Sequence, residues 1–142
     1  MAAPTNTWEF AYDLFGTSVP IVSVFAASAD LEVSEGTLVS LVDGMLEVGL
    51  ANPIGLAYEA TTAPLDEGVG VKVGIIAPGM VIRGKASADA SELVGFNGKA
   101  YDVTAEGALD VADDSGGALS VHRVENAGMS VWCVLTKHAL FG

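Results

Sequence analysis

The chain has 142 residues and a formal net charge of −12, because 18 Asp and Glu oppose six Lys and Arg. This length allows one domain with a core of its own, and so acidic a surface argues against binding to nucleic acid or to an anionic membrane. Apolar residues make up 51% of the sequence, yet no run of 18 or more of them occurs, which excludes a membrane-spanning helix.

The N-terminal segment differs in composition from the rest. Half of the ten aromatic residues lie in the first 25 positions, ahead of a Gly-, Ala- and Val-rich remainder. We therefore predict an N-terminal arm (residues 1–30) on a β body (residues 31–142). No basic residue precedes the apolar stretch 19–29, so we expect no secretion signal.

The sequence of the arm is compatible with two kinds of secondary structure, a strand and a helix. Trp8, Phe10, Tyr12 and Leu14 alternate with small or acidic residues, which is the period of a β-strand. Trp8, Tyr12 and Phe15 also follow the i, i+4, i+7 spacing of a helix. Both readings stay open.

The arm aromatics are the residues most indicative of function. They pack either into the chain's own core or onto a sister subunit or another protein, where aromatic side chains are common anchors and an extended segment adds a strand to a sheet edge. The candidate partner-binding residues are Trp8, Phe10, Tyr12, Leu14 and Phe15. The C-terminal stretch 137–142, which contains Phe141, is a smaller candidate of the same kind.

The remainder of the chain predicts an all-β fold. Asp43-Gly44 and Asn97-Gly98 are two-residue hairpin signals, and residues 84–93 suit a loop or one or two helical turns. Strands recurring every roughly 8 to 12 residues, with turn signals between them, indicate a β-barrel or β-sandwich. We expect strands at 21–25, 37–42, 45–50, 54–58, 69–75, 80–83, 93–96, 99–103, 108–112, 119–124 and 130–136.

The segment 68–75 has the clearest alternation in the sequence. Val69, Val71, Val73 and Ile75 alternate with glycines and one lysine, which predicts one β-branched face and one nearly bare face. Its glycines resemble a dinucleotide fingerprint only superficially, because the third glycine comes one residue late and no helix is expected to follow.

Catalytic and metal-binding patterns are weak. Cys133 is the only cysteine and lies in an apolar run, so we expect a buried, inert thiol and no disulfide within the chain. His122 and His138 are the only histidines, and their spacing with Cys133 matches no standard zinc site. The acidic segment 110–115 lacks the order of a calcium-binding loop. The sequence predicts a binding or assembly protein without metal or cofactor, and not an enzyme.

Five segments between residues 36 and 136 resemble the decoration, or capsid cement, proteins of tailed bacteriophages. They follow that family's order of strands and end on a Val-Gly hairpin and a closing strand. The segments are Gly36-Thr-Leu-Val-Ser-Leu, Ile54-Gly-Leu-Ala, Gly68-Val-Gly-Val-Lys-Val, Val94-Gly-Phe-Asn-Gly-Lys-Ala-Tyr-Asp-Val and Val131-Trp-Cys-Val-Leu. The aromatic arm departs from the family's shorter N-terminus.

The resemblance implies a compact β-barrel-like body, often a trimer, made in the host cytoplasm and bound to the outside of an icosahedral head. There it would clamp neighbouring subunits of the major capsid protein after expansion. Two alternatives use the same β pattern: a self-assembling phage tail or surface-layer protein, and a small β-barrel enzyme or ligand carrier, which needs a polar cavity.

Overall fold

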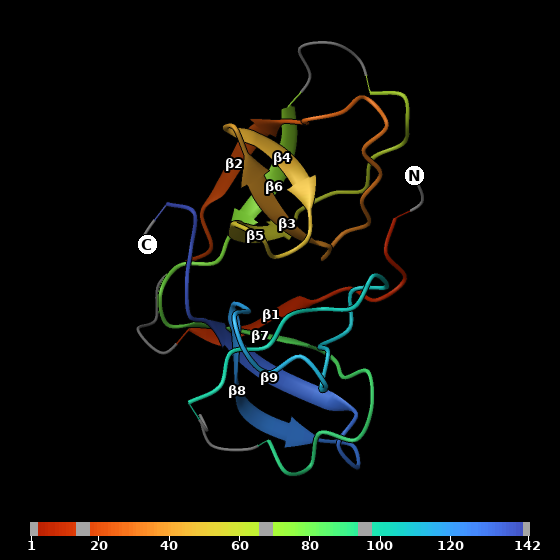
Figure 1. Ribbon diagram of the computed structural model, residues 1–142. Helices are drawn as coiled ribbons and strands as arrows, with labels where there is room; N and C mark the ends of the chain where they lie inside the picture. The colour runs from red at the N-terminus through yellow and green to blue at the C-terminus, as the bar shows by residue number, and fades with distance from the viewer. Residues whose placement is uncertain (1–2, 14–17, 66–69, 94–97, 141–142) are drawn as a thin grey trace.

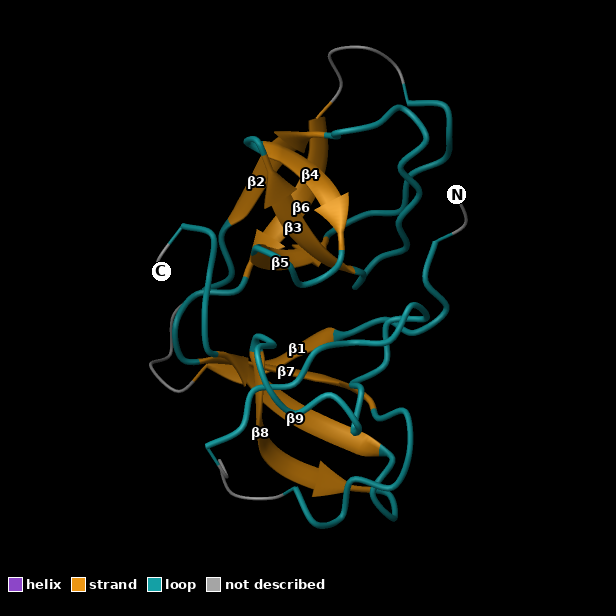
Figure 2. Ribbon diagram, viewed as in Figure 1, coloured by secondary structure: helices purple, strands orange, loops and turns teal. Residues whose placement is uncertain are grey.

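The computed structural model describes residues 3–13, 18–65, 70–93 and 98–140, and within these ranges it contains nine strands and no helix (Figures 1 and 2). The described part accordingly has no helix that could cross a membrane. The strands are β1 (Glu9–Asp13), β2 (Ile21–Phe25), β3 (Leu38–Val42), β4 (Met45–Val48), β5 (Pro53–Ala57), β6 (Gly70–Ile75), β7 (Met80–Lys85), β8 (Leu119–Glu125) and β9 (Ser130–Leu135).

The strands form two antiparallel sheets that pack together, which confirms the all-β prediction. The four-stranded sheet has the order β1-β7-β9-β8, and the five-stranded sheet has the order β2-β6-β5-β3-β4. They are the lower and upper layers in Figure 1. The five-stranded sheet curls until its edge strands meet at one parallel bridge, Ala26–Leu46, where the Ala27 N–H donates to the Leu46 carbonyl at 2.9 Å. The ladder does not close a barrel.

Local sequence explains the hairpin between β3 and β4. Asp43 and Gly44 both have positive φ, 50° and 78°, as a two-residue hairpin turn of this kind requires. The turn brings Val42 opposite Met45, and the pairing continues to Val39 opposite Val48. The predicted Asp-Gly hairpin is therefore confirmed.

The alternation predicted for residues 68–75 is also confirmed within β6, whereas Val69 lies outside the described residues. Val71, Val73 and Ile75 are buried in the core of the five-stranded sheet. On the opposite face, a Cβ placed on Gly74 would lie only 3.0 Å from the ring of Phe10, which belongs to β1. The bare face of β6 thus accepts a side chain from the other sheet, and this contact joins the two layers.

The N-terminal segment contributes an edge strand to each sheet. β1 pairs with β7 and β2 pairs with β6, so the strand reading holds for residues 9–13. The segment that we predicted as an arm therefore packs, where it is described, as part of both sheets.

The strands expected at 99–103 and 108–112 are wrong. These residues form a long connection with isolated bridges, Tyr101–Leu119 and Val103–Leu109. Its side chains nevertheless fill the core of the four-stranded sheet, where Tyr101 and Leu109 are fully buried. Burial in this core, rather than a ladder, accounts for the apolar residues of both segments. Residues 94–97, and with them Asn97 of the second hairpin signal, lie outside the described residues.

Candidate functional site

Trp8, the first candidate partner-binding residue, lies in the chain's own core. Its side chain is 3% exposed, and a Cβ placed on Gly84 would lie 2.3 Å from its ring, so the indole stacks directly on the β7 backbone. The indole N–H donates to the Gly107 carbonyl at 2.8 Å. The sequence left open whether the arm aromatics pack into the chain's own core or onto a partner. The packing of Trp8 favours the core, because a folded chain cannot offer this ring to a partner.

The other candidates differ in their surroundings. Phe10 is half-buried and packs against the core of the four-stranded sheet. Tyr12 is 40% exposed, and its ring meets His122 edge-on, with the ring centroids 6.1 Å apart. Leu14 and Phe15 lie outside the described residues, as does Phe141 at the C-terminus.

The single thiol of the chain lies in the core of the four-stranded sheet. Cys133 is buried, and burial raises the pKa of its thiol. Within residues 3–13, 18–65, 70–93 and 98–140, no group of three or more His, Cys, Asp or Glu side chains could hold a metal ion.

His138 fastens the C-terminal segment to the five-stranded sheet. Its Nδ1 accepts the Leu140 N–H at 2.9 Å, so Nε2 carries the proton and donates to the Ile54 carbonyl at 2.8 Å. The neighbouring Ala139 N–H donates to the Pro53 carbonyl. Burial lowers the pKa of this imidazole from its usual 6.5.

The lowered pKa of His138 predicts acid sensitivity. The neutral ring is favoured in the folded chain, so its contribution to stability is complete above about pH 6.5 and declines as the pH falls below that value. We expect the free energy of unfolding in urea to fall between about pH 7.5 and about pH 5.5, and to fall less in His138→Gln. His122→Gln is the matched control. An equal fall in wild type and His138→Gln would contradict this role.

Exposed apolar side chains gather on the outside of the five-stranded sheet. Val42 and Met45 flank the hairpin turn and are Cα partners, so they share a face. The parallel bridge at Ala26–Leu46 brings Phe25 beside Met45 on the same face. We call these three residues the Phe25 patch: Phe25 is 60% exposed, Met45 40% and Val42 36%.

The edge strand β2 extends this apolar surface. Its sequence, Ile-Val-Ser-Val-Phe, contains no charge. Ile21 is exposed and lies on the same face of the sheet as Phe25. Natural edge strands usually carry charges or prolines that prevent pairing with other chains. β2 has neither between Ile21 and Phe25, and Pro20 precedes it. Phe25 lies within the predicted arm (residues 1–30) but is not among the candidate partner-binding residues, because the approach of β2 to β4 cannot be predicted from local alternation.

The outside of the four-stranded sheet has a different chemistry. Glu9, Arg83, Trp132 and Arg123 are successive Cα partners on β1, β7, β9 and β8, so they form one row across the sheet. The Arg83 and Arg123 guanidinium carbons lie 5.6 and 4.9 Å from the centroid of the Trp132 ring. We call Arg83, Trp132 and Arg123 the Arg–Trp row.

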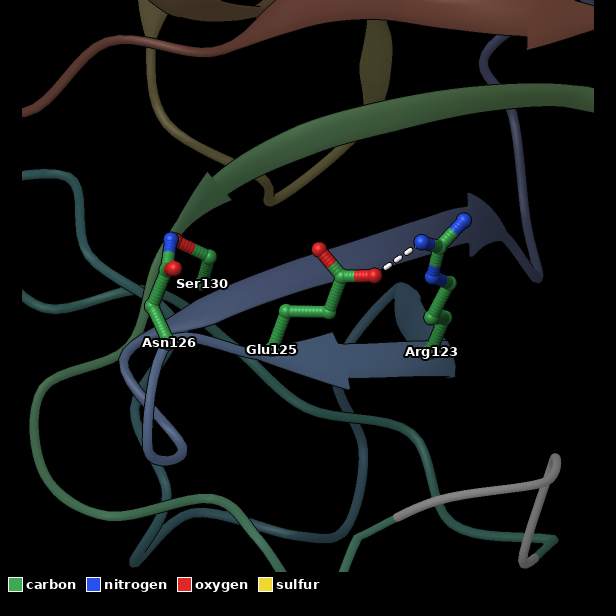
Figure 3. A network of polar contacts seen from close by, with 4 residues as sticks. All are labelled: Arg123, Glu125, Asn126 and Ser130. Carbon is green, nitrogen blue, oxygen red and sulfur yellow. Dashed lines mark hydrogen bonds and ion pairs between the residues drawn. The ribbon is translucent and has the colours of Figure 1, made fainter.

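Carboxylates stand at both ends of this row. Glu9 pairs with Arg83 at 2.5 Å, and Glu125 pairs with Arg123, as Figure 3 shows. In the adjoining turn, the Asn126 side-chain amide donates to the Ser130 hydroxyl at 2.8 Å. The paired side chains are all about half exposed. The two ion pairs therefore orient the arginine side chains and add little to stability.

A polar groove of about 510 Å³ continues from the Arg83 end of the row. Its floor includes Gly84 and its walls carry two cations and two carboxylates. The lining residues are Thr5, Asn6, Thr7, Trp8, Glu9, Glu35, Arg83, Gly84, Lys85 and Ser130.

Comparison of the chain with protein-family models, with curated proteins and with solved structures gives no match. The two outer sheet faces, one apolar and one rich in Arg and Trp, are therefore the surfaces from which we infer a function. Their residue types, exposed Phe and Met on one side and Arg with Trp on the other, are those enriched at protein–protein interfaces.

Proposed function

We propose that this chain is a structural virion protein that binds the outer surface of an icosahedral phage head and cements neighbouring major capsid subunits. The observation that carries the proposal is the exposed Phe25 patch with its uncharged edge strand β2. An apolar surface of this kind on an acidic chain favours docking onto another protein, and the resemblance of residues 36–136 to capsid decoration proteins favours a capsid as that protein.

Cementing follows from mass action. A protein that contacts two neighbouring subunits gains its full buried area only where the lattice presents both at the right spacing, so binding stabilises the expanded state over the unexpanded one. The Phe25 patch and the Arg–Trp row lie on different sheets, which suits contact with two neighbours. In a trimer, three copies of each surface would bind together and modest contacts would sum to firm attachment.

The remaining features fit a structural role that requires no catalysis. The protein would act as a non-enzymatic component of the capsid exterior after synthesis in the host cytoplasm. Its net charge of −12 would keep coated particles apart in solution by mutual repulsion.

The test is cosedimentation with expanded and unexpanded phage heads. We expect saturable binding to expanded heads, and Phe25→Ser to weaken it by about 1.5 kcal/mol, or roughly tenfold, through loss of apolar burial. Met129→Ser is the matched control, because Met129 has similar exposure to Met45 but lies in the turn before β9 of the other sheet. Equal loss in both variants, or full binding by Phe25→Ser, would remove the patch as the anchor.

One observation favours a second candidate, a self-assembling phage tail or surface-layer protein. An uncharged, exposed edge strand such as β2 is suited to pairing between identical chains. Sedimentation of the purified protein alone separates the two: discrete small oligomers support a cement protein, and open polymers that disappear in Ser23→Lys support self-assembly.

A further inference from the structure

The segment that follows β9 joins the two sheets. On the four-stranded side, the Thr136 N–H donates to the Ala118 carbonyl at 2.8 Å. The Lys137 ammonium donates to the Gly116 carbonyl at 3.1 Å. The segment then reaches the five-stranded sheet, as the blue trace that rises from β9 in Figure 1 shows. There residues 138–140, which we call the latch, lie against the start of β5.

The hydrogen bonds of the latch converge on the His138 ring. Nε2 donates to the Ile54 carbonyl at 2.8 Å, and Nδ1 accepts the Leu140 N–H at 2.9 Å. Between them along the chain, the Ala139 N–H donates to the Pro53 carbonyl at 2.8 Å. Only the neutral ring with its proton on Nε2 satisfies both ring contacts, because a neutral imidazole donates at one nitrogen and accepts at the other.

The surroundings of the ring suit its neutral form. His138 is buried, and β5, with the sequence Pro-Ile-Gly-Leu-Ala, has no ionisable side chain. The connection 76–78 (Ile-Ala-Pro) has none either, and it lines a pocket of about 180 Å³ beside the ring. The other charged side chain in that lining is the cation Lys137. Burial in this setting lowers the pKa of the imidazole, so the closed latch holds the neutral ring.

Protonation of His138 conflicts with this arrangement. An imidazolium carries a proton on each nitrogen, so Nδ1 can no longer accept the Leu140 N–H and two donors face each other. The charged ring also lacks the hydration that it has in water, which costs free energy. Both penalties disappear when the ring moves into water. Ala139 lies between His138 and Leu140, so its bond to β5 breaks with theirs.

We infer that residues 138–140 are a latch that opens in acid: protonation of His138 detaches them from β5 while both sheets stay folded. The opening ends at Lys137, because the hydrogen bonds of the preceding part of the segment to residues 116–118 do not involve the ring. A local opening of this kind needs less free energy than global unfolding. It uncovers the Ile54 carbonyl and widens the adjoining pocket. The inference goes beyond the proposed function and does not depend on it.

Amide hydrogen exchange in the full chain tests the latch residue by residue. The quantity compared is the protection factor, which is the exchange rate of an unstructured chain divided by the measured rate at the same pH. Between about pH 7.5 and about pH 5 we expect the protection factors of the Ala139 and Leu140 amides to fall about tenfold, because a solvated imidazole of pKa about 6.5 is mostly protonated at the lower pH. The Thr136 and Ala27 amides, which are bonded to carbonyls outside the latch, should keep theirs.

Two variants and one spectrum complete the test. His138→Gln offers a donor and an acceptor without a titratable group, so we expect the protection of Ala139 and Leu140 to become independent of pH. His122→Gln is the matched control, because His122 is the other histidine of the chain and lies on β8, and it should leave the pH dependence intact. In the wild type, a nitrogen-15 spectrum of the imidazoles at about pH 7.5 should show the His138 proton on Nε2, a readout that needs no variant.

Four results would overturn the inference. The first is unchanged protection of Ala139 and Leu140 in acid, and the second is an equal fall at Thr136 and Ala27, which would mean that the whole fold opens. The third is the same pH dependence in His138→Gln, and the fourth is a His138 proton on Nδ1 near neutral pH. Because no phage head is used, failure here leaves the capsid proposal standing, and failure of capsid binding leaves this result standing.

Discussion

Trp8→Ala is expected to lower the free energy of unfolding by about 4 kcal/mol, a large share of the about 5–15 kcal/mol by which small domains are stable. The substitution removes a buried indole that lies against the β7 backbone at Gly84. It also leaves the Gly107 carbonyl without the indole N–H that bonds to it. Urea unfolding followed by far-ultraviolet circular dichroism measures the change.

Two variants separate packing from hydrogen bonding at this position. Trp8→Phe keeps an aromatic ring and loses the N–H, so we expect a smaller cost of about 2 kcal/mol. Tyr12→Ala, at an exposed position of the adjoining strand β1, should cost about 1 kcal/mol or less. If Trp8→Ala cost no more than Tyr12→Ala, the burial of the indole in the core would be refuted. Deletion of residues 1–15 should unfold the chain for the same reason, rather than merely detach it from a partner.

Gly55→Ala is expected to destabilise the fold by about 3 kcal/mol through steric overlap. A Cβ on Gly55 of β5 would lie 1.9 Å from the Gly74 carbonyl oxygen of β6, and that oxygen belongs to the backbone of a paired strand. Relief requires β5 and β6 to move apart, which disturbs the middle of the five-stranded sheet. Chemical denaturation gives the magnitude.

Gly44→Ala provides the contrast. Gly44 has positive φ, and a Cβ there would meet nothing within 4 Å, so its cost comes only from the left-handed backbone and should be about 1 kcal/mol. Gly55 has no such conformational requirement. A cost for Gly55→Ala equal to or below that of Gly44→Ala would show that β5 and β6 are further apart than described.

Much of the fold could be predicted from local sequence because its signals are local. Asp43-Gly44 specifies a turn by backbone conformation alone, and the alternation in β6 specifies which face is buried. The strands expected at 99–103 and 108–112 are wrong because apolar side chains on an irregular connection fill a core just as strand side chains do.

The candidate site was less predictable because it depends on which strands become neighbours. Trp8 is an aromatic residue with interface character, and only the position of Gly84 and Gly107 in space makes it a core residue. The Arg–Trp row spans three strands, and one of them, β7, is far from β8 and β9 in the sequence. Alternation places each of Arg83, Arg123 and Trp132 on a face of its own strand, but their alignment appears only once the strand order is known.

The distance along the chain between Trp8 and its partners also has a consequence for synthesis. Trp8 is made early, yet its hydrogen-bond acceptor at Gly107 is 99 residues further on, and β1 pairs with β7. At about 5–20 residues per second, the N-terminal strand must wait several seconds for its neighbours to leave the ribosome. Such long-range pairings also make folding slow. The nascent chain therefore presents the Trp8 indole unburied until Gly107 has left the ribosome, and exposed apolar surface of this kind makes such intermediates prone to aggregation.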